Sequence, residues 1–297
     1  MQSVDISRET IKGFGDEILS ATFYKIGDMK PKGIIIINPA TAVKQNLYAS
    51  FAKFIALQNY LVVTFDYQGI GLSRSKKITD YKTTLHQYSQ DAKAVFDYLI
   101  TKYKQNIFII GHSVGGSFIG FSESNTNPRL IGAYCICMQS GYKGYAPSKS
   151  LKRKLNILYY GIIPILTTLK GYLPAKSLKL GEDLPKEVAR EFAQWGNNKR
   201  YNLDFIEQNP VYNYFESLSF PMYLVNFSDD EWSTQNSIDD IANLYSNCHI
   251  EREYINPKEL GIKKVGHMGF FNIRCKQSLW VSSLSWINQI FDKNLIK

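Results

Sequence analysis

The sequence has few cysteines and few histidines, with four of each among 297 residues. Four cysteines are too few for a disulfide scaffold in a chain of this length, and the absence of paired CxxC motifs argues against a structural zinc site. The first ten residues, MQSVDISRET, lack the basic-then-apolar pattern of a signal peptide. We therefore expect a protein of a reducing, cytoplasmic compartment.

Internal repeats and low-complexity segments are also missing from the sequence. The composition is 44% hydrophobic and 14% aromatic, which excludes a disordered chain and allows a sizeable core. The length fits one large domain or two small ones.

Acidic residues are scarce in one part of the chain. The net charge is +9, and residues 142–200 carry twelve Lys or Arg against four Asp or Glu, which leaves 23 basic and 22 acidic residues elsewhere. A nucleic-acid binder would need a groove-reading helix or a stacking sheet motif, and we find neither. The excess lysines either keep a surface solvated or meet an anionic head group or membrane.

Apolar segments alternate with helical patterns along most of the chain. Buried strands are predicted at 32–38, 60–66, 106–111, 130–138, 220–227 and 248–255, and helices at 46–58, 84–103, 115–124, 235–246 and 276–292. This alternation predicts an α/β fold with a mainly parallel sheet and helices on both faces. Ligands of such sheets bind at the carboxyl ends of the strands.

Residues 142–215 break the alternation and contain no clear strand. We interpret them as a helical insertion folded over the sheet, with residues 1–141 and 216–297 forming the core. Residues 155–174 approach the length of a membrane span, but Gly161, Pro164, Lys170 and Gly171 interrupt them. A buried or interfacial helix pair is therefore expected rather than a transmembrane helix.

The segment FIIGHSVGGSFIG, residues 108–120, ends a predicted strand in a G-x-S-x-G pattern. A serine between glycines at a strand-to-helix turn is typical of a nucleophile elbow, which makes Ser113 the candidate nucleophile. The pattern alone occurs often by chance. The assignment therefore depends on the predicted strand before it and on the predicted helix after it, which begins with small residues. The start of that helix would aim backbone N–H groups at the space above the serine.

A serine hydroxyl needs a base, and only four histidines are available. His86 lies in a predicted helix, and the side chain of His112 diverges from its neighbour Ser113. His249 begins a predicted strand. His267 lies in a glycine-flanked loop after the last strand, GHMGFF, and is the candidate base.

The base needs an acid that fixes its tautomer. Asp229, Asp230 and Glu231 directly follow the fifth predicted strand in the segment SDDE, at the expected ligand-binding edge. Each of them could instead belong to a solvated loop or cap a helix. The order serine, acid, histidine is that of one fold in particular.

These motifs resemble those of the alpha/beta hydrolase superfamily, most closely small bacterial hydrolases related to serine aminopeptidases and monoacylglycerol lipases. The resemblance covers about residues 10–292, with 142–215 as the lid (cap) insertion. It is carried by INPAT, FDYQGIGLS, GHSVGG, SDDE and GHMGFF, which occur in the family's order.

The resemblance implies an alpha/beta hydrolase fold and sharpens the site. Asp230 is favoured over Asp229 as the acid, because Thr234 then takes the place of the small residue that follows four positions later. Asp66 would shape the loop after its strand. The oxyanion hole would come from the N–H groups of Val114 and Ala40, although Asn38 and Pro39 replace the usual His-Gly before that position.

These inferences predict a serine hydrolase that cleaves a carboxylic ester or thioester of a medium or long acyl chain, with no metal and no organic cofactor. Apolar residues of the insertion suit the acyl chain. An acyltransferase, an aminopeptidase-like amide hydrolase and a non-catalytic lipid- or anion-binding module remain alternatives. The amide hydrolase is disfavoured because the insertion has no acidic cluster to bind an amine. We expect no nucleic-acid partner and a transient contact of the basic insertion with an anionic membrane surface.

Overall fold

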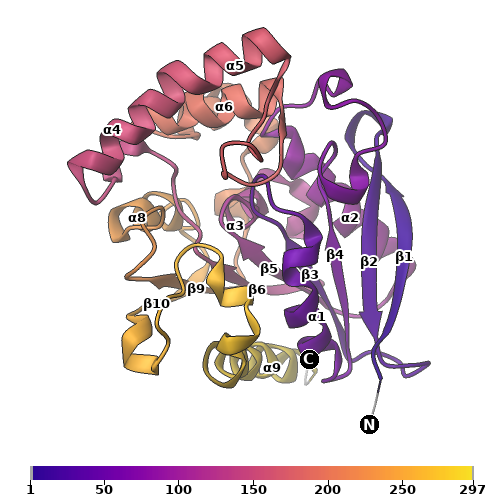
Figure 1. The fold of residues 1–297 in the computed structure, drawn as a ribbon. Coiled ribbons are helices and arrows are strands. Elements are labelled where there is room, and N and C mark those ends of the chain that lie inside the picture. The colour runs from indigo at the N-terminus through magenta and orange to yellow at the C-terminus, as the bar shows by residue number, and fades with distance from the viewer. Residues whose placement is uncertain (1–2, 296–297) are drawn as a thin grey trace.

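The computed structural model describes residues 3–295 and contains an eight-stranded sheet in the order β1-β2-β4-β3-β5-β6-β9-β10 (Figure 1). Strands β4, β3, β5, β6, β9 and β10 run parallel to one another, whereas β2 pairs antiparallel with β1 and β4. The bounds are β1 (Asp5–Lys12), β2 (Ile18–Lys25), β3 (Gly33–Asn38), β4 (Tyr60–Phe65), β5 (Ile107–His112), β6 (Leu130–Ile136), β9 (Pro221–Phe227) and β10 (His249–Ile255).

All six predicted strands are present, but β10, which was predicted to be buried, is mostly exposed. The structure adds the antiparallel hairpin β1–β2, which the sequence did not predict. Strand β1, DISRETIK, lies at the edge of the sheet and most of its residues are exposed. A strand that faces solvent on both sides needs no apolar run, so hydrophobicity gave no sign of it.

Helices cover both faces of the sheet, as expected for a parallel α/β arrangement. In β3, Ile34 and Ile36 belong to one core, while Ile35 and Ile37 belong to the other. The first core includes residues of α2, α3 and α8, and the second includes residues of α1 and α9. The helices are α1 (Ala49–Ala56), α2 (Gln87–Lys102), α3 (Val114–Ser117), α8 (Gln235–Ala242) and α9 (Val281–Leu295).

The insertion between β6 and β9 holds the remaining helices and lies over one end of the sheet (Figure 1). It comprises α4 (Lys149–Ile157), α5 (Ile163–Lys170), α6 (Lys186–Asn197), α7 (Leu203–Gln208) and the two-residue strands β7 (Tyr172–Leu173) and β8 (Leu184–Pro185). The expectation of an insertion without strands was therefore wrong at β7 and β8, which pair with each other.

The prediction that residues 155–174 form a pair of helices was also wrong. A π-helical turn, Leu158–Ile162, joins α4 to α5 into one helical run, and the run ends at Gly171 with φ 74°. Pro164 is the second residue of α5 and directly follows the π-helical turn, where the regular α-helical hydrogen-bond pattern is already interrupted. Within residues 3–295, no helix combines the length and the apolarity that crossing a membrane requires.

The turn after β5 leaves no room for side chains at its glycines. A Cβ at Gly111 would lie 2.4 Å from the Cα of Gly116, and a Cβ at Gly115 would lie 2.4 Å from the carbonyl oxygen of Asn38. The start of α3 therefore touches both β5 and the end of β3, and this contact requires glycine.

We predict that Gly115→Ala lowers the free energy of unfolding by about 3 kcal/mol, because the new methyl group meets backbone rather than a movable side chain. Urea unfolding followed by circular dichroism measures the effect. Gly161→Ala is the matched control, since a Cβ there has nothing within 4 Å and should change stability by less than about 1 kcal/mol. Equal stability of the two variants would contradict the packing described for the turn.

Candidate active site

Ser113 lies between β5 and α3 in a strained backbone conformation, with φ 54° and ψ −124°. A positive φ is uncommon for a residue with a side chain and has an energetic cost, so it is retained where the surroundings enforce it. The Ser113 N–H donates to the carbonyl of Ile136 at 2.9 Å, and the Ser113 carbonyl accepts from Gly116 at 3.0 Å. These bonds fix the turn that presents the serine.

The side chain of His267 meets Asp230, with 2.7 Å between Nδ1 and Oδ2. Burial alone would raise the pKa of Asp230, but hydrogen bonding and charge interaction with His267 outweigh it, aided by the Trp232 N–H, and the net pKa is lowered. Asp230 is therefore an ionised acceptor, and Nδ1 of His267 carries the proton. This tautomer leaves Nε2 with a lone pair that can accept a proton.

The neighbouring acids have other roles. Asp229 accepts hydrogen bonds from the N–H groups of Val265 at 2.8 Å and Gly266 at 2.9 Å, which shapes the loop leading to His267. Glu231 is exposed. Of the three carboxylates after β9, Asp230 alone contacts the imidazole of His267 in the part of the chain that the structure describes.

Ser113 and His267 line one cavity of about 400 Å³. Within residues 3–295, no hydrogen bond joins the Ser113 hydroxyl to His267. Most of the wall is apolar and much of it comes from the insertion: Leu158, Ile163, Leu173, Ala175, Leu180, Leu184 and Phe192.

The expected oxyanion donor Ala40 is wrong for this geometry, because its N–H already donates to the hydroxyl of Tyr48 at 3.0 Å. The next residue, Thr41, lines the cavity together with Val114. Among the described residues, the N–H groups of Thr41 and Val114 have no hydrogen-bond partner. Because the Tyr48 hydroxyl occupies the Ala40 N–H, the next backbone donor along the chain at this cavity is that of Thr41.

His112 connects the loop after β3 to the loop of His267. Its Nε2 lies 2.8 Å from the His267 carbonyl, which can only accept, so Nε2 donates and Nδ1 accepts from the Tyr48 hydroxyl at 2.9 Å. Burial, with a smaller contribution from the charge of His267, lowers the pKa of His112 to about 3. The ring of His112 therefore stays neutral. Each group in this chain of hydrogen bonds donates to the next, from the Ala40 N–H to Tyr48, from Tyr48 to His112 and from His112 to the His267 carbonyl.

Two polar side chains of the cavity have buried atoms without partners. Gln139, which is 7% exposed, and Thr41 both line the cavity. Among the described residues, Gln139 Oε1 and Thr41 Oγ1 accept and donate no hydrogen bond. An unpaired buried polar atom costs free energy, and a ligand or a water in the cavity would supply the missing partner. Sequence reasoning missed Gln139, since nothing in the segment CMQSGY marks it.

Cys137, Asp230 and His267 place three potential metal ligands within 4.8 Å of one another. The 2.7 Å between Asp230 and His267 is a direct hydrogen bond, whereas two ligands of a tetrahedral zinc lie roughly 3.3 Å apart. Burial also raises the pKa of the Cys137 thiol well above its usual value, and a thiolate is the form that binds metal. The arrangement fits a hydrogen-bonded pair better than a metal centre.

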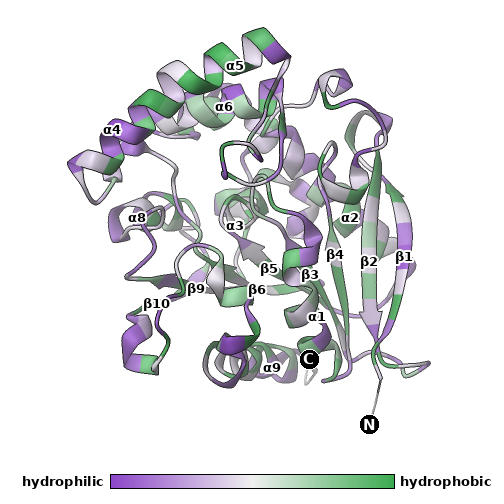
Figure 2. Cartoon of the chain, in the orientation of Figure 1, coloured by the Kyte–Doolittle hydropathy of each residue, from purple (hydrophilic) through white to green (hydrophobic). Residues whose placement is uncertain are grey.

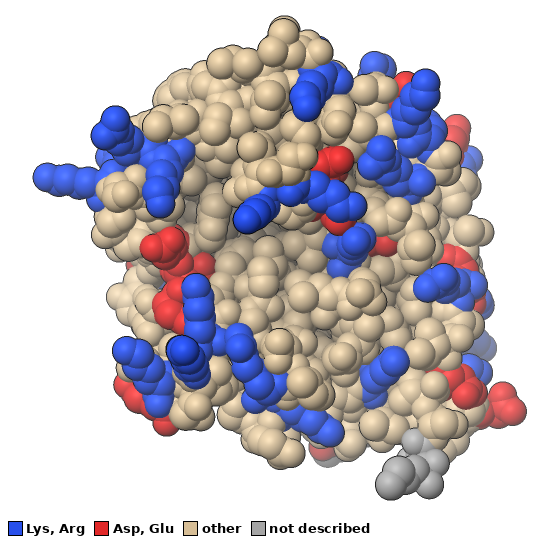
Figure 3. All heavy atoms as spheres, viewed as in Figure 1, with Lys and Arg blue, Asp and Glu red and all other residues tan. Residues whose placement is uncertain are grey.

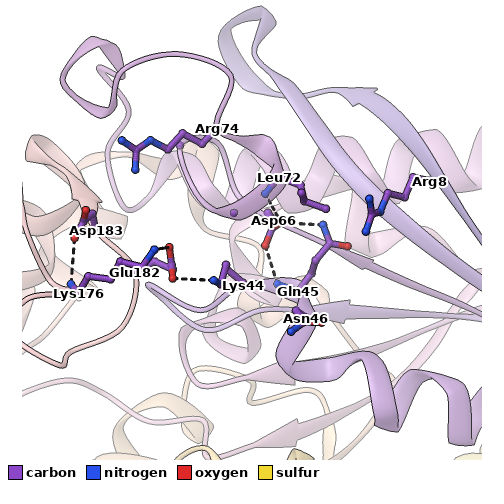
Figure 4. Close-up of a pocket in the computed structure, with 12 residues that line it drawn as sticks. Arg8, Lys44, Gln45, Asn46, Asp66, Leu72, Arg74, Lys176, Glu182 and Asp183 are labelled. Atoms are coloured by element: carbon purple, nitrogen blue, oxygen red, sulfur yellow. Dashed lines mark hydrogen bonds and ion pairs between the residues drawn. The ribbon is translucent and has the colours of Figure 1, made fainter.

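A second cavity, of about 480 Å³, is lined by charged residues and contains neither Ser113 nor His267 (Figure 4). In this cavity Glu182 forms ion pairs with Lys44 at 3.1 Å and with Lys176 at 3.2 Å. The Asp66 carboxylate accepts from the N–H groups of Gln45 and Leu72 at 2.7 and 2.8 Å. Asp66 therefore ties two loops together, in line with the loop-shaping role that the family resemblance implied.

The sequence matches one family profile and one curated protein. A profile of the family described as "Serine aminopeptidase, S33" matches residues 29–157. Abhydrolase domain-containing protein 2 of Drosophila melanogaster is 22% identical over 248 residues, which cover 74% of this chain and 58% of that protein. The chain thus spans less than two thirds of that relative's length.

Solved structures share the fold at low identity. The esterase Pf2001 of Pyrococcus furiosus has a TM-score of 0.62 at 15% identity, covering 98% of this chain and 91% of that one. A thermostable carboxyl esterase from Bacillus coagulans has a TM-score of 0.62 at 14% identity, covering 97% and 100%. Alpha/beta hydrolase domain-containing protein 10 from mouse has a TM-score of 0.57 at 16% identity, covering 97% and 99%. The mainly parallel sheet, the strand-to-helix turn at Ser113 and these structural matches show that the chain has the alpha/beta hydrolase fold.

Proposed function

We propose that the protein is a serine hydrolase that cleaves a carboxylic ester or thioester through an acyl-enzyme on Ser113. The observation that carries the proposal is the hydrogen bond between His267 and Asp230 beside a cavity that the strained Ser113 also lines. Covalent acyl transfer needs a nucleophile and a general base, and these two residues would supply them.

In the proposed mechanism, the hydroxyl oxygen of Ser113 attacks the substrate carbonyl while Nε2 of His267 takes its proton. Asp230 stabilises the imidazolium that forms. The C–O or C–S bond then breaks, and the leaving alcohol or thiol takes the proton back from His267. Water, activated by the same imidazole, hydrolyses the acyl-serine and regenerates the hydroxyl.

Stabilisation of the oxyanion is assigned to the backbone N–H groups of Val114 and Thr41, in place of the pair with Ala40 that the sequence indicated. Both residues border the cavity beside Ser113, and the Thr41 hydroxyl lies at the same place. Preorganised donors of this kind supply a large part of the rate enhancement in acyl transfer.

An acyl substrate with a polar group near its carbonyl suits the cavity. Its apolar wall fits a medium or long acyl chain, and Gln139 offers a hydrogen bond to the polar part. None of the residues that line the cavity is acidic. A substrate with a free amino end would find no counter-ion there, so aminopeptidase-like activity is disfavoured.

Two other functions remain as rivals. An acyltransferase would use the same residues with an alcohol as acceptor, and product analysis with added alcohols separates it from a hydrolase. A non-catalytic binding module would use the cavity without turnover, which the hydrogen-bonded pair of His267 and Asp230 argues against. We place the protein in the cytoplasm, since its four cysteines are free and three of them are buried.

We predict that a fluorophosphonate probe labels the parent protein and that Ser113→Ala and His267→Ala abolish the labelling, because the first lacks the nucleophile and the second lacks its base. In-gel fluorescence measures the labelling, with circular dichroism to show that each variant is folded. Ser117→Ala is the matched control, because Ser117 is a buried serine four residues away. A folded parent that stays unlabelled, or a labelled Ser113→Ala protein, would refute the proposed nucleophile.

We predict that Asp230→Asn lowers kcat for a short-chain aryl ester by about 10³-fold or more, because an amide cannot stabilise the imidazolium. Asp229→Asn should lower kcat by less than about tenfold, because the contact between His267 and Asp230 remains. Steady-state kinetics of both variants measures the difference. A larger loss in Asp229→Asn than in Asp230→Asn would reverse the assignment of the acid.

We predict that Gln139→Leu lowers kcat/KM about tenfold while leaving thermal stability unchanged or increased. The leucine removes an unpaired buried polar atom at similar volume, which relieves the folded state but deprives the substrate of a hydrogen bond. Thermal unfolding and ester kinetics on the same preparation test the two effects together. A protein that is less stable yet fully active would show that Gln139 serves the fold and not the substrate.

A further inference from the structure

The helical run of α4, the π-turn and α5, residues 149–170, has two apolar faces. Every fourth residue on the inner face is buried against the rest of the protein: Leu155, Tyr159, Ile163 and Thr167. The opposite face carries apolar side chains that are largely exposed, namely Ile157 at 52%, Tyr160 at 66%, Ile165 at 57% and Leu169 at 77%. We call these four residues the outer stripe. Figure 2 shows the strongly apolar character of α5 in this run.

The segment of the chain that contains the outer stripe carries charge of one sign. Residues 142–181 contain eight Lys or Arg and no Asp or Glu. Lys149, Lys152, Arg153 and Lys154 are exposed, and within residues 3–295 none of them forms an ion pair. In Figure 3, blue side chains project at the end where α4 lies in Figure 1, beside the tan surface over α5.

We propose that the outer stripe docks onto the surface of an anionic lipid bilayer. The four apolar side chains would enter the interface between head groups and acyl chains, and the cations of α4 would lie among the lipid phosphates. The run lies along the bilayer and does not cross it, because its inner face remains packed on the protein. This goes beyond the activity proposed above and does not depend on it.

Charge complementarity favours a bilayer over a second copy of the chain. A symmetric contact through the outer stripe would bring the same cluster of cations together from both copies, with no acidic residue in 142–181 to neutralise it. An anionic bilayer has an apolar interior beneath a negatively charged surface. The apolar side chains of the outer stripe match the interior, and the cations of α4 match the surface.

Docking at this face would place the cavity close to the lipid. Leu158 and Ile163, from the same helical run, form part of the cavity wall beside Ser113. A lipid-like acyl substrate could then pass between bilayer and cavity along the insertion, without crossing water.

The test is co-sedimentation of the full chain with vesicles of phosphatidylcholine alone or mixed with phosphatidylglycerol. We expect binding to the mixed vesicles that weakens as salt is added. Leu169→Ser and Ile165→Ser should each reduce binding at least fivefold, and Lys152→Gln combined with Lys154→Gln should reduce both the binding and its salt dependence.

Ile273→Ser is the matched control, because Ile273 is 61% exposed and lies outside the insertion. Ser113→Ala should bind as the parent does, which separates binding from chemistry. Equal loss in Ile273→Ser and Leu169→Ser, or no binding of the folded parent to mixed vesicles, would overturn the proposal. Light scattering that shows the parent to be a dimer and Leu169→Ser to be a monomer would identify a second copy as the occupant and would also overturn it.

Discussion

The site depends on a backbone contact at which α3 begins directly against β5 and the end of β3. Gly111 and Gly115 permit this contact because neither has a Cβ to keep the chains apart. The turn between them forces Ser113 into its positive φ and opens the helix with the N–H of Val114. The position of the serine is therefore set by packing in the core, and the energetic cost of its conformation is met by the bonds around it.

A second constraint couples the loops around that turn. Hydrogen bonds run from the Ala40 N–H to Tyr48, from Tyr48 to His112, and from His112 to the carbonyl of His267. Because His112 stays neutral in its buried position, the direction of these bonds does not change with ordinary changes in pH. These bonds thus connect the loop of Ala40 and Thr41 to the loop that carries the His267 imidazole, through the residue next to Ser113.

The sequence predicted most of the fold and part of the site. Apolar runs located the buried parallel strands, and the alternation of strands and helices placed the mostly exposed β10 after them. The exposed strand β1 has no such run, and the buried strand β2 was missed together with it. Elimination among four histidines selected His267. The choice of Ala40 failed, because a backbone N–H that is used by the distant hydroxyl of Tyr48 leaves no sign in the sequence. Gln139 was missed for the same reason, since its significance is an unpaired atom in three dimensions.

The central claim is that Ser113 forms a covalent acyl-enzyme. Rapid mixing with a p-nitrophenyl acyl ester, an acid quench and mass spectrometry of the digested protein test it directly. We predict a burst of one p-nitrophenol per chain and an acyl group on the peptide that contains Ser113. Turnover of the ester without any acylated peptide, or an acyl group on another residue, would contradict the account.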